Sequence, residues 1–595
     1  MRRNHSGTGK PVFGKTSAFC EACLVVFTCQ FFPVFLGAQA PPNVLFILTS
    51  EQGWGDLRCH GNDSLFTPNL DRLAAESVEF DRFYVNPAGA STRAGLLTGR
   101  YAPRAGVRGE AHRREVMRAV EVTMAEVFRG VGYRTALFGE WDNGAQYPND
   151  PTGQGFDEFF GFFGGDTDPL PMHNRDTART TEISPDALTT RAIEYLSADP
   201  QRPFFCMLAF DAPRNPCHSP AFYAEKYQKA GFSGQNAALY GAIENIDANV
   251  GRLLQALDSL GIRDNTYIVF TSDGGPGNSR FNAGLRGQKG SFYEGGIRVP
   301  CFLHRRNYLA PRHLPKPAAH IDLLPTITGL CEFPLPASVR PDGVNFSRIM
   351  QGAPDLPGDR MLFFHFSQGK TSPYPGAVRA GRFAFILPGE DGAELYNVRN
   401  DPAQTFDLAD SLPEIAVLLK KQYLDWYANA ASRGNDPPPI PVGSRKGDLT
   451  LLPALDCDTT AAERPKDHIP EPGVVRQDVW LDERDSVIRW RIDVPEKGLY
   501  DIFVQYACDS AFAGKSINLV TDGSENHLII EESSQNFYTA SRGRNPCDGA
   551  GKKDWKSVST GKDALHQGVQ TIRLYLPYDR KGEIEIKGLI LKKLN

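Results

Sequence analysis

Short apolar runs alternate with amphipathic segments between Asn43 and Thr271, and this alternation restricts the fold more than any other feature of the chain. The run Asn43–Thr49 has an apolar interior and polar neighbours, which is typical of a strand buried on both faces of a parallel sheet. Similar runs are Thr135–Phe138, Pro203–Phe210 and Thr266–Thr271. Helical patterns lie between these runs, at Leu70–Ser77, Pro185–Leu196 and Leu239–Leu257. Strands alternating with helices predict a doubly wound α/β sheet that binds ligands at the carboxyl ends of its strands.

The sequence pattern changes twice after this domain. Short strands are expected at Met361–His365, Ala377–Leu387 and Glu394–Val398, followed by an amphipathic helix at Pro413–Tyr427. The proline-rich run Asp436–Pro441 indicates a linker without regular structure. Beyond it, runs that alternate apolar and polar residues predict a small antiparallel β-sandwich that folds on its own. These runs are Val487–Val494, Gly498–Tyr506, Ser516–Val520, Thr571–Leu576 and Glu583–Leu591.

The N-terminus has the parts of a secretory signal: basic residues, an apolar run at 24–36 and small residues at 37–40. The apolar run is short and interrupted by Gln30 and Pro33, so we expect cleavage and export to the periplasm or the cell exterior. A retained membrane anchor is the alternative. We predict five segments: a signal peptide (1–40), an α/β domain (41–350), a smaller antiparallel subdomain (351–431), a linker (432–451) and a β-sandwich that is a candidate for carbohydrate binding (452–595).

Bulk composition excludes two classes of function. A formal net charge of -5 and a pI near 6.2 argue against a nucleic-acid partner. Three of the eleven cysteines lie in the signal, and no C-x-x-C pair follows it, which argues against a structural zinc site. Cys206 and Cys301 lie in apolar runs and are expected to be buried thiols.

The stretch Gly89–Arg100, GASTRAGLLTGR, resembles the signature of the sulfatase family, C/S-x-P-S-R-A-x-L-L-T-G-R, and matches it closely from Arg93 onward. Four further blocks occur in the family's order: NVLFILTSEQGWGDL from Asn43, LRGQKGSFYEGGIRVP from Leu285, HIDLLPTI from His320 and ELYNVRNDPAQTFDLA from Glu394. The resemblance covers Asn43 to Gly443. It implies an alkaline-phosphatase-like α/β fold with a small antiparallel subdomain, and an arylsulfatase-like hydrolase of sulfated polysaccharides.

The same resemblance shows which parts of the family chemistry are missing. The family's Cys or Ser, which is oxidised to the nucleophilic formylglycine, falls on Gly89, where no nucleophile can form. The family binds a divalent cation, usually calcium, through an Asp-Asp pair and a later Asp-Asn or Asp-His pair. These pairs are here Ser50 with Glu51 and Asp273 with Gly274. We therefore predict no tightly bound cofactor, and at most a weak calcium site at Asp273 and Glu51.

The residues that would contact sulfate change as well. Glu140 stands where the family has a Lys, and Asp142 and Arg214 stand where it has His residues. Two matches are retained: Arg93, which in the family steadies the nucleophile, and Lys289, which contacts the sulfate. The predicted pocket thus holds four carboxylates and three cations: Glu51, Glu140, Asp142, Asp273, Arg93, Arg214 and Lys289. This surplus of negative charge opposes sulfate binding in the family manner.

Several alternatives remain open for single residues. One alternative is that Arg93 and Lys289 have only a structural role and pair with the new acids Glu140 and Asp142. Another is that Ser91 or Thr92 replaces the missing nucleophile. A third alternative is that His218 replaces one of the missing family histidines, although a histidine in a loop is more often simply exposed to solvent. Five aromatic residues of the last domain either stack on sugars or fill the core, and the core is favoured. They are Trp480, Trp490, Tyr500, Tyr506 and Trp555.

Three functional hypotheses follow. The first is an exported member of the sulfatase family without formylglycine-dependent sulfuric ester hydrolase activity, which binds a sulfated or neutral polysaccharide or another anionic ligand. The second is an active sulfuric or phosphoric ester hydrolase with a non-standard site. The third is a glycan-binding protein that acts through its C-terminal sandwich, with the α/β domain as scaffold. Because one fold supports many functions, the pocket residues decide between them.

Overall fold

The computed structural model describes most of the chain from Ala40 to Leu594. The described residues are 40–109, 116–164, 171–178, 184–214, 217, 219–354, 360–367, 372–432, 439–443, 449–453, 487–508, 510, 513–532, 556–576 and 584–594. The predicted signal (1–40) falls outside them except for Ala40, as do His218, Trp480 and Trp555. No helix within the described ranges is long and apolar enough to cross a membrane.

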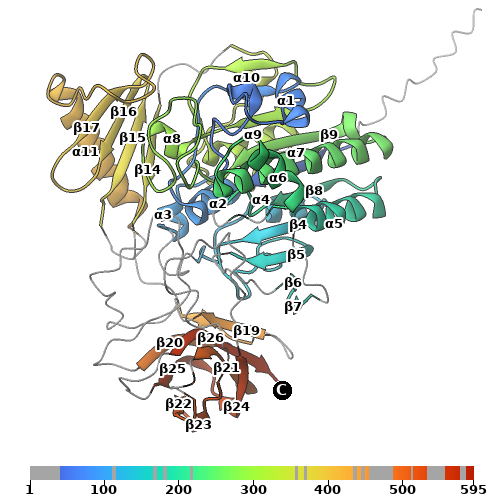
Figure 1. Cartoon of the computed structure of the whole chain (residues 1–595), viewed down its shortest axis with the longest axis vertical. Helices are drawn as coiled ribbons and strands as arrows, with labels where there is room; N and C mark the ends of the chain where they lie inside the picture. The colour runs from blue at the N-terminus through green and yellow to red at the C-terminus, as the bar shows by residue number, and fades with distance from the viewer. Residues whose placement is uncertain are drawn as a thin grey trace, which may run out of the picture. The chain divides into compact units, whose positions relative to one another are not determined.

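Four parallel strands form the centre of a ten-stranded sheet, and they are the apolar runs of the sequence (Figure 1). They are β1 (Asn43–Thr49), β4 (Arg134–Trp141), β8 (Phe204–Ala209) and β9 (Thr266–Ser272), in the spatial order β9-β1-β8-β4. Every residue of β1 is buried, because helices cover both faces of the sheet. The predicted doubly wound α/β class is therefore confirmed.

Alternate residues of β1 point into two separate cores. Leu45 and Ile47 pack with α1, α5 and α7, whereas Val44, Phe46 and Leu48 pack with α2, α4 and α9. These helices are α1 (Pro68–Ala75), α2 (Gly89–Thr98), α4 (Met124–Gly130), α5 (Pro185–Ala198), α7 (Gly234–Ser259) and α9 (Leu323–Leu330). Because successive side chains of a strand point to opposite faces of the sheet, β1 contributes to both hydrophobic cores.

The edges of the large sheet are partly antiparallel, so the sheet is mixed. At one edge β11 runs antiparallel to β9 and β2, and at the other β6 runs antiparallel to β5 and β7. The edge strands are β2 (Val78–Phe80), β5 (Glu158–Phe163), β6 (Met172–His173), β7 (Asp176–Thr177), β11 (Cys301–His304) and β12 (Arg312–Leu314). None exceeds six residues, and those of two or three residues are too short for a readable period.

Shorter elements connect these layers. They are β3 (Phe83–Tyr84), β10 (Arg298–Val299) and β13 (Ala318–Ala319), which form a small sheet; the helices α3 (Ala102–Ala105), α6 (Ala221–Lys229), α8 (Glu294–Ile297) and α10 (Ser347–Met350); and the 3-10 turns η1 (Arg58–His60), η3 (Arg263–Asn265) and η4 (His320–Asp322).

A four-stranded antiparallel sheet with one helix follows the large sheet. It consists of β14 (Met361–His365), β15 (Gly376–Ala380), β16 (Phe383–Leu387), β17 (Glu394–Asn397) and α11 (Pro413–Ala430). The run Ala377–Leu387, expected as one strand, is instead a hairpin. Its turn uses Gly381 at φ 56, a left-handed backbone conformation that glycine adopts without a steric penalty.

The C-terminal region forms two sheets around one core, and their pairings are antiparallel, as the alternating runs predict, except for one parallel edge strand. One sheet has the order β18-β20-β25-β22-β23 and the other β19-β26-β21-β24. The strands are β18 (Ile440–Pro441), β19 (Leu449–Pro453), β20 (Val487–Val494), β21 (Gly498–Cys508), β22 (Ser516–Val520), β23 (Glu525–Ile529), β24 (Lys556–Leu565), β25 (Gly568–Tyr575) and β26 (Ile584–Lys593). Contrary to expectation, the end of the proline-rich run is regular: β18 pairs with β20 at the sheet edge, where proline is tolerated.

Two expectations about buried side chains can be checked in the described residues. Trp490, Tyr500 and Tyr506 have no exposed surface and lie in the sandwich core, so these aromatic residues do not form a sugar-stacking platform. Cys206 and Cys301 are fully buried, as predicted.

Candidate functional site

The predicted site residues converge at the carboxyl ends of the central strands. Glu51 follows β1, Glu140 and Asp142 lie at the end of β4, and Asp273 follows β9. Arg214 lies in the loop after β8, and Lys289 comes from the loop after β9. Gly89 and Arg93 belong to the first turns of α2. The structure therefore brings all the predicted residues to the edge of the sheet where α/β domains bind ligands.

Arg93 lies at the centre of the site and is 2% exposed. Its Nη2 atom is 2.6 Å from Oε2 of Glu140 and 2.9 Å from Oδ2 of Asp273. Its Nε atom is 3.1 Å from Oδ2 of Asp142, and its Nη1 donates to the Glu140 carbonyl oxygen at 3.0 Å. The guanidinium thus contacts three carboxylates at once. Burying a charge is costly without such partners, so these contacts hold Arg93 in one position.

The remaining cations extend this network in both directions. Arg214 Nη1 lies 2.6 Å from Oε1 of Glu140, so Glu140 bridges two arginines. Lys289 Nζ lies 2.8 Å from Oε1 of Glu51, and the Glu51 N–H donates to Oδ1 of Asp273 at 3.1 Å. Arg93 pairs with both new acids, as one alternative expects, whereas Lys289 pairs with Glu51.

The surplus negative charge of the site falls on Asp142. Burial raises the pKa of its carboxyl group to about 7, the neighbouring Glu140 carboxylate adds to the shift, and Arg93 opposes it. Asp273 behaves in the opposite way: burial alone would raise its pKa, but Arg93 and Lys289 together hold it below its ordinary value. When Asp142 carries a proton, the site has three carboxylates for its three cations, and its charges balance.

Gly89 faces the carboxylate of Asp273. A Cβ atom added at Gly89 would lie 2.9 Å from Oδ2 of Asp273, closer than van der Waals contact. Ser91 and Thr92 do not replace a nucleophile there: both are fully buried, and the Thr92 hydroxyl is engaged with the backbone of Asn86. Position 89 thus lacks a side chain, and adding one would require Asp273 to shift.

The donor set does not fit a divalent cation. The Glu51 carboxylate accepts from Lys289, and both oxygens of Asp273 are engaged, by the Glu51 N–H and by Arg93. Gly274 has no side chain to contribute. One oxygen from each of Glu140, Asp142 and Asp273 lies within 4.8 Å of the others, but Arg93 bonds all three carboxylates. The Arg93 guanidinium therefore lies between the carboxylates, in the position where a divalent cation would have to bind with six to eight oxygen ligands.

Sequence reasoning missed one buried ion pair beside the site. Arg280 donates to both carboxylate oxygens of Asp56, at 2.8 and 2.7 Å, and to the Glu51 carbonyl oxygen at 2.7 Å. Both side chains are 1% exposed. The pair supports the loop in which Glu51 adopts a left-handed backbone with φ 60, which is unfavourable for a residue with a Cβ atom. Arg280 lies in none of the family-like blocks, so no sequence signal marked it.

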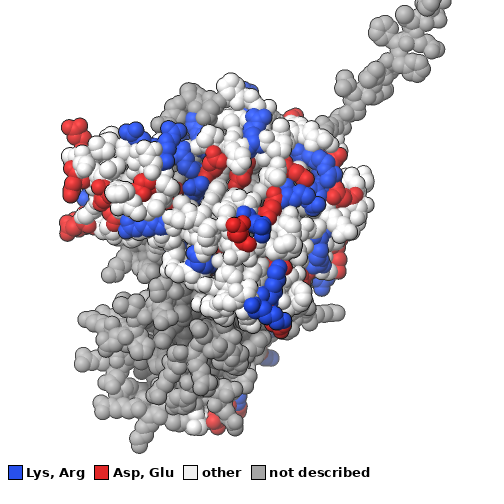
Figure 2. Space-filling model, turned by 45° about the horizontal axis from the view of Figure 1, so that its top comes forward, with Lys and Arg blue, Asp and Glu red and all other residues white. Residues whose placement is uncertain are grey.

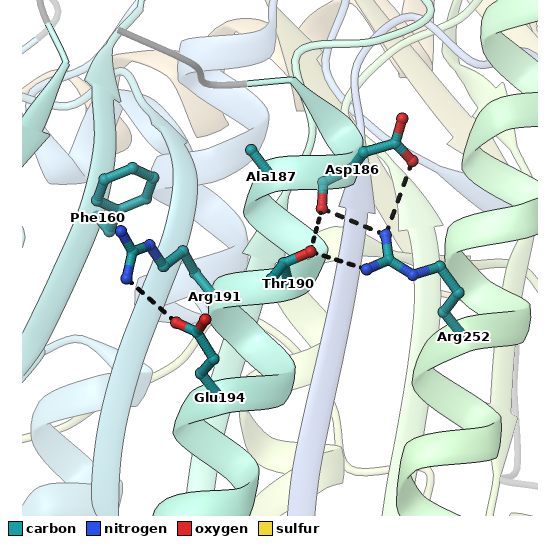
Figure 3. Close-up of a pocket in the computed structure, with 7 residues that line it drawn as sticks. All are labelled: Phe160, Asp186, Ala187, Thr190, Arg191, Glu194 and Arg252. Carbon is teal, nitrogen blue, oxygen red and sulfur yellow. Dashed lines mark hydrogen bonds and ion pairs between the residues drawn. The ribbon is translucent and has the colours of Figure 1, made fainter. Parts of the chain in front are cut away.

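A surface hollow of about 370 Å³ lies elsewhere, over α5 and α7 (Figure 3). Its lining residues are Phe160, Asp186, Ala187, Thr190, Arg191, Glu194 and Arg252, none of which belongs to the predicted site. Arg191 pairs with Glu194 at 3.1 Å, and Arg252 with Asp186 at 3.7 Å. The hollow is open and its charges are paired, so it does not compete with the network around Arg93 as the candidate functional site.

Comparisons with known proteins agree with the fold. The sulfatase family model matches residues 42–332. Arylsulfatase A of Homo sapiens is 30% identical over 478 residues, which cover 68% of this chain and 92% of that protein. N-acetylgalactosamine-6-sulfatase of Rattus norvegicus is 31% identical over 372 residues, which cover 55% of this chain and 69% of that protein. The solved structure of Ps i-CgsB in complex with k-i-k-neocarrahexaose superimposes with a TM-score of 0.61 at 24% identity, over 65% of this chain and 93% of that one.

We expect Gly89→Ala to lower the free energy of unfolding by about 1–3 kcal/mol, because the added methyl group meets an Asp273 carboxylate that Arg93 holds in place. Gly274→Ala is the matched control, since a Cβ atom there meets nothing within 4 Å. Its effect should stay within about 0.5 kcal/mol. Urea denaturation at pH 7 measures both, and equal effects would show that Gly89 has room.

Asp142→Asn should stabilise the protein above pH 7. The folded-state pKa of Asp142 is raised to about 7, so the folded protein binds the proton more tightly than the unfolded chain does. The resulting stability is complete below about pH 4, the ordinary value, and is lost as the pH rises through 7. The effect amounts to at most about 4 kcal/mol. Urea denaturation between pH 4 and 8 should give a flatter profile for the variant than for the wild type, and parallel profiles would refute this account.

Calcium should stabilise the protein little. A site filled at 100 times its dissociation constant would add about 2.7 kcal/mol. Calorimetric melts with millimolar calcium and with a chelator should therefore nearly coincide, because Lys289 and Arg93 occupy the carboxylates. A large upward shift with calcium would mean that the ion displaces these cations.

Proposed function

Since this chain belongs to the sulfatase family, we propose that it is a member that does not hydrolyse sulfate esters through a formylglycine, and that it acts by binding an anionic glycan. One observation carries the first half. Position 89, the family's nucleophile position, is a glycine, and a Cβ atom added there would lie 2.9 Å from Oδ2 of Asp273. The position has no nucleophile, and a side chain added there would displace the Asp273 carboxylate.

The ion-pair network supports the same conclusion. Arg93 and Lys289, the two retained family residues, both bond acids of the chain itself. Glu140 places negative charge where the family has a Lys. Reversing one charge about 4 Å from a sulfate changes their interaction by up to roughly 8 kcal/mol at an effective dielectric constant of about 20. A sulfate ester entering the site must therefore compete with carboxylates that are already in place.

The relatives support a sulfated glycan as the ligand class. One is named an N-acetylgalactosamine-6-sulfatase, and one solved neighbour holds a neocarrahexaose. The N-terminal segment 1–40 supports export to a compartment where such glycans occur. On the described face that Figure 2 draws, basic and acidic residues are interspersed over the α/β part of the chain.

A surviving hydrolase with a non-standard site is the alternative. It would need a nucleophile near Asp273, and the nearest candidates in α2, Ser91 and Thr92, are both buried. This favours the non-hydrolytic interpretation.

Purified full-length protein should release no sulfate from aryl sulfates or sulfated oligosaccharides. The matched controls are Lys289→Ala and Asp273→Ala, whose background rates should equal the wild-type rate. Sulfate release by ion chromatography is the measurement. Turnover that either substitution abolishes would refute the proposal and support a non-standard active site, whereas turnover that survives both comes from a contaminant.

A further inference from the structure

The five-stranded sheet of the sandwich carries arginines side by side on its outer face. Arg489 of β20 lies directly opposite Arg573 of β25, and Arg491 follows two residues along β20 on the same face. Arg489 and Arg491 are exposed and Arg573 is partly exposed, whereas the intervening Trp490 and Ile572 fill the core. We call Arg489, Arg491 and Arg573 the arginine cluster.

This arrangement is unfavourable for the sheet by itself. Neighbouring strands lie about 5 Å apart, so the positive charges of Arg489 and Arg573 lie close together. Like charges directly opposite each other destabilise a sheet. Arg573 has an acidic neighbour in Asp522 at 3.9 Å, but these side chains are 35% and 47% exposed, and such a contact contributes little.

The other sheet of the same sandwich is arranged differently. On its outer face Asp501 of β21 lies opposite Lys562 of β24 on one side and opposite Lys592 of β26 on the other. Opposite charges therefore face each other across these strands. The contrast shows that the sandwich architecture itself does not require the arginine cluster.

Polar and aromatic groups continue the face beside the arginine cluster. Tyr575 of β25 is 40% exposed and lies opposite Val487 on one neighbouring strand and Asn518 on the other. The Asn518 Oδ1 atom lies 2.8 Å from Nδ1 of His527 in the next strand. An exposed ring beside an amide and an imidazole suits a sugar, whose C–H face packs on the ring while its hydroxyl groups bond the polar atoms.

Two acids mark the margins of the face. Asp493 is exposed at the end of β20, two residues past Arg491, and Glu525 begins the edge strand β23 and accepts from Asn518 at 3.3 Å. Positive charge is thus concentrated in the middle of the face. This pattern selects a ligand with closely spaced anionic groups.

We propose that the outer face of β20, β25 and β22 binds a sulfated polysaccharide, with the arginine cluster bonding sulfate groups and Tyr575 packing on a sugar ring. Guanidinium groups present a planar fork of donors that matches oxyanions. The negative charge of the whole chain disfavours the long phosphate track of a nucleic acid, whereas a local cluster with an adjacent ring fits a sulfated sugar. This proposal rests on the glycan binding of the proposed function and assigns that binding to the sandwich instead of the α/β pocket.

The test uses the full-length protein, with dextran sulfate as the probe and unsulfated dextran of the same length as the reference. Titration calorimetry at low salt should show binding to dextran sulfate. The double variant Arg489→Gln/Arg573→Gln should bind about tenfold more weakly, with a flatter salt dependence, because two charge-assisted contacts are lost. Tyr575→Ala should weaken binding a further few-fold. Thermal melts check that the variants fold, and removing like charges should not lower the melting temperature.

The matched control, Lys562→Gln/Lys592→Gln, removes the same charge from the other sheet and should leave the affinity within about twofold. Equal losses in both double variants would overturn the inference in favour of non-specific charge attraction. Equal affinity for duplex DNA, with no effect of Tyr575→Ala, would overturn the assignment to a glycan. If only Lys289→Gln abolishes binding, the ligand lies in the α/β pocket, so the inference fails while the proposed function stands. If the wild type binds no sulfated glycan, both fail.

Discussion

The contacts of one buried guanidinium determine the structure of this site. Arg93 bonds carboxylates that follow two different strands of the sheet, and it approaches them from the first turns of α2. In a water-filled pocket such ion pairs would contribute little, but Arg93 is 2% exposed, so its buried charge depends on these carboxylates. The position of α2 against the sheet therefore depends on Arg93, and so does the closed space around Gly89.

The network also explains how the charges of the site are balanced within the fold. A pocket built for an anion and a dication needs both charges to be balanced. Here Glu140 supplies negative charge to Arg93 and Arg214, and Arg93 supplies positive charge to three carboxylates. Asp142 takes up the remaining imbalance by holding a proton near neutral pH. The charges that a ligand and a metal would bring are replaced by side chains that fold with the protein.

The sequence predicted the parts of this structure that depend on local pattern. The four central strands appear as apolar runs, and their carboxyl ends place Glu51, Glu140 and Asp273 together by topology alone. It could not predict which acid pairs with which cation, since Arg93 and Asp273 lie 180 residues apart and their contact depends on packing. The same holds for Arg280 with Asp56, and for the Arg489–Arg573 register, which appears only once β20 and β25 are paired. Edge strands of two or three residues carry no readable period.

The bridging position of Glu140 makes this charge network sensitive to single substitutions. A change of Glu140 to lysine would place a third cation between Arg93 and Arg214 and remove the carboxylate that both share. A single change of Arg214 would likewise leave Glu140 with one cation fewer. Because these charges share partners, the effects of such changes on stability do not add. The network therefore restricts which single substitutions the site accepts without a loss of stability.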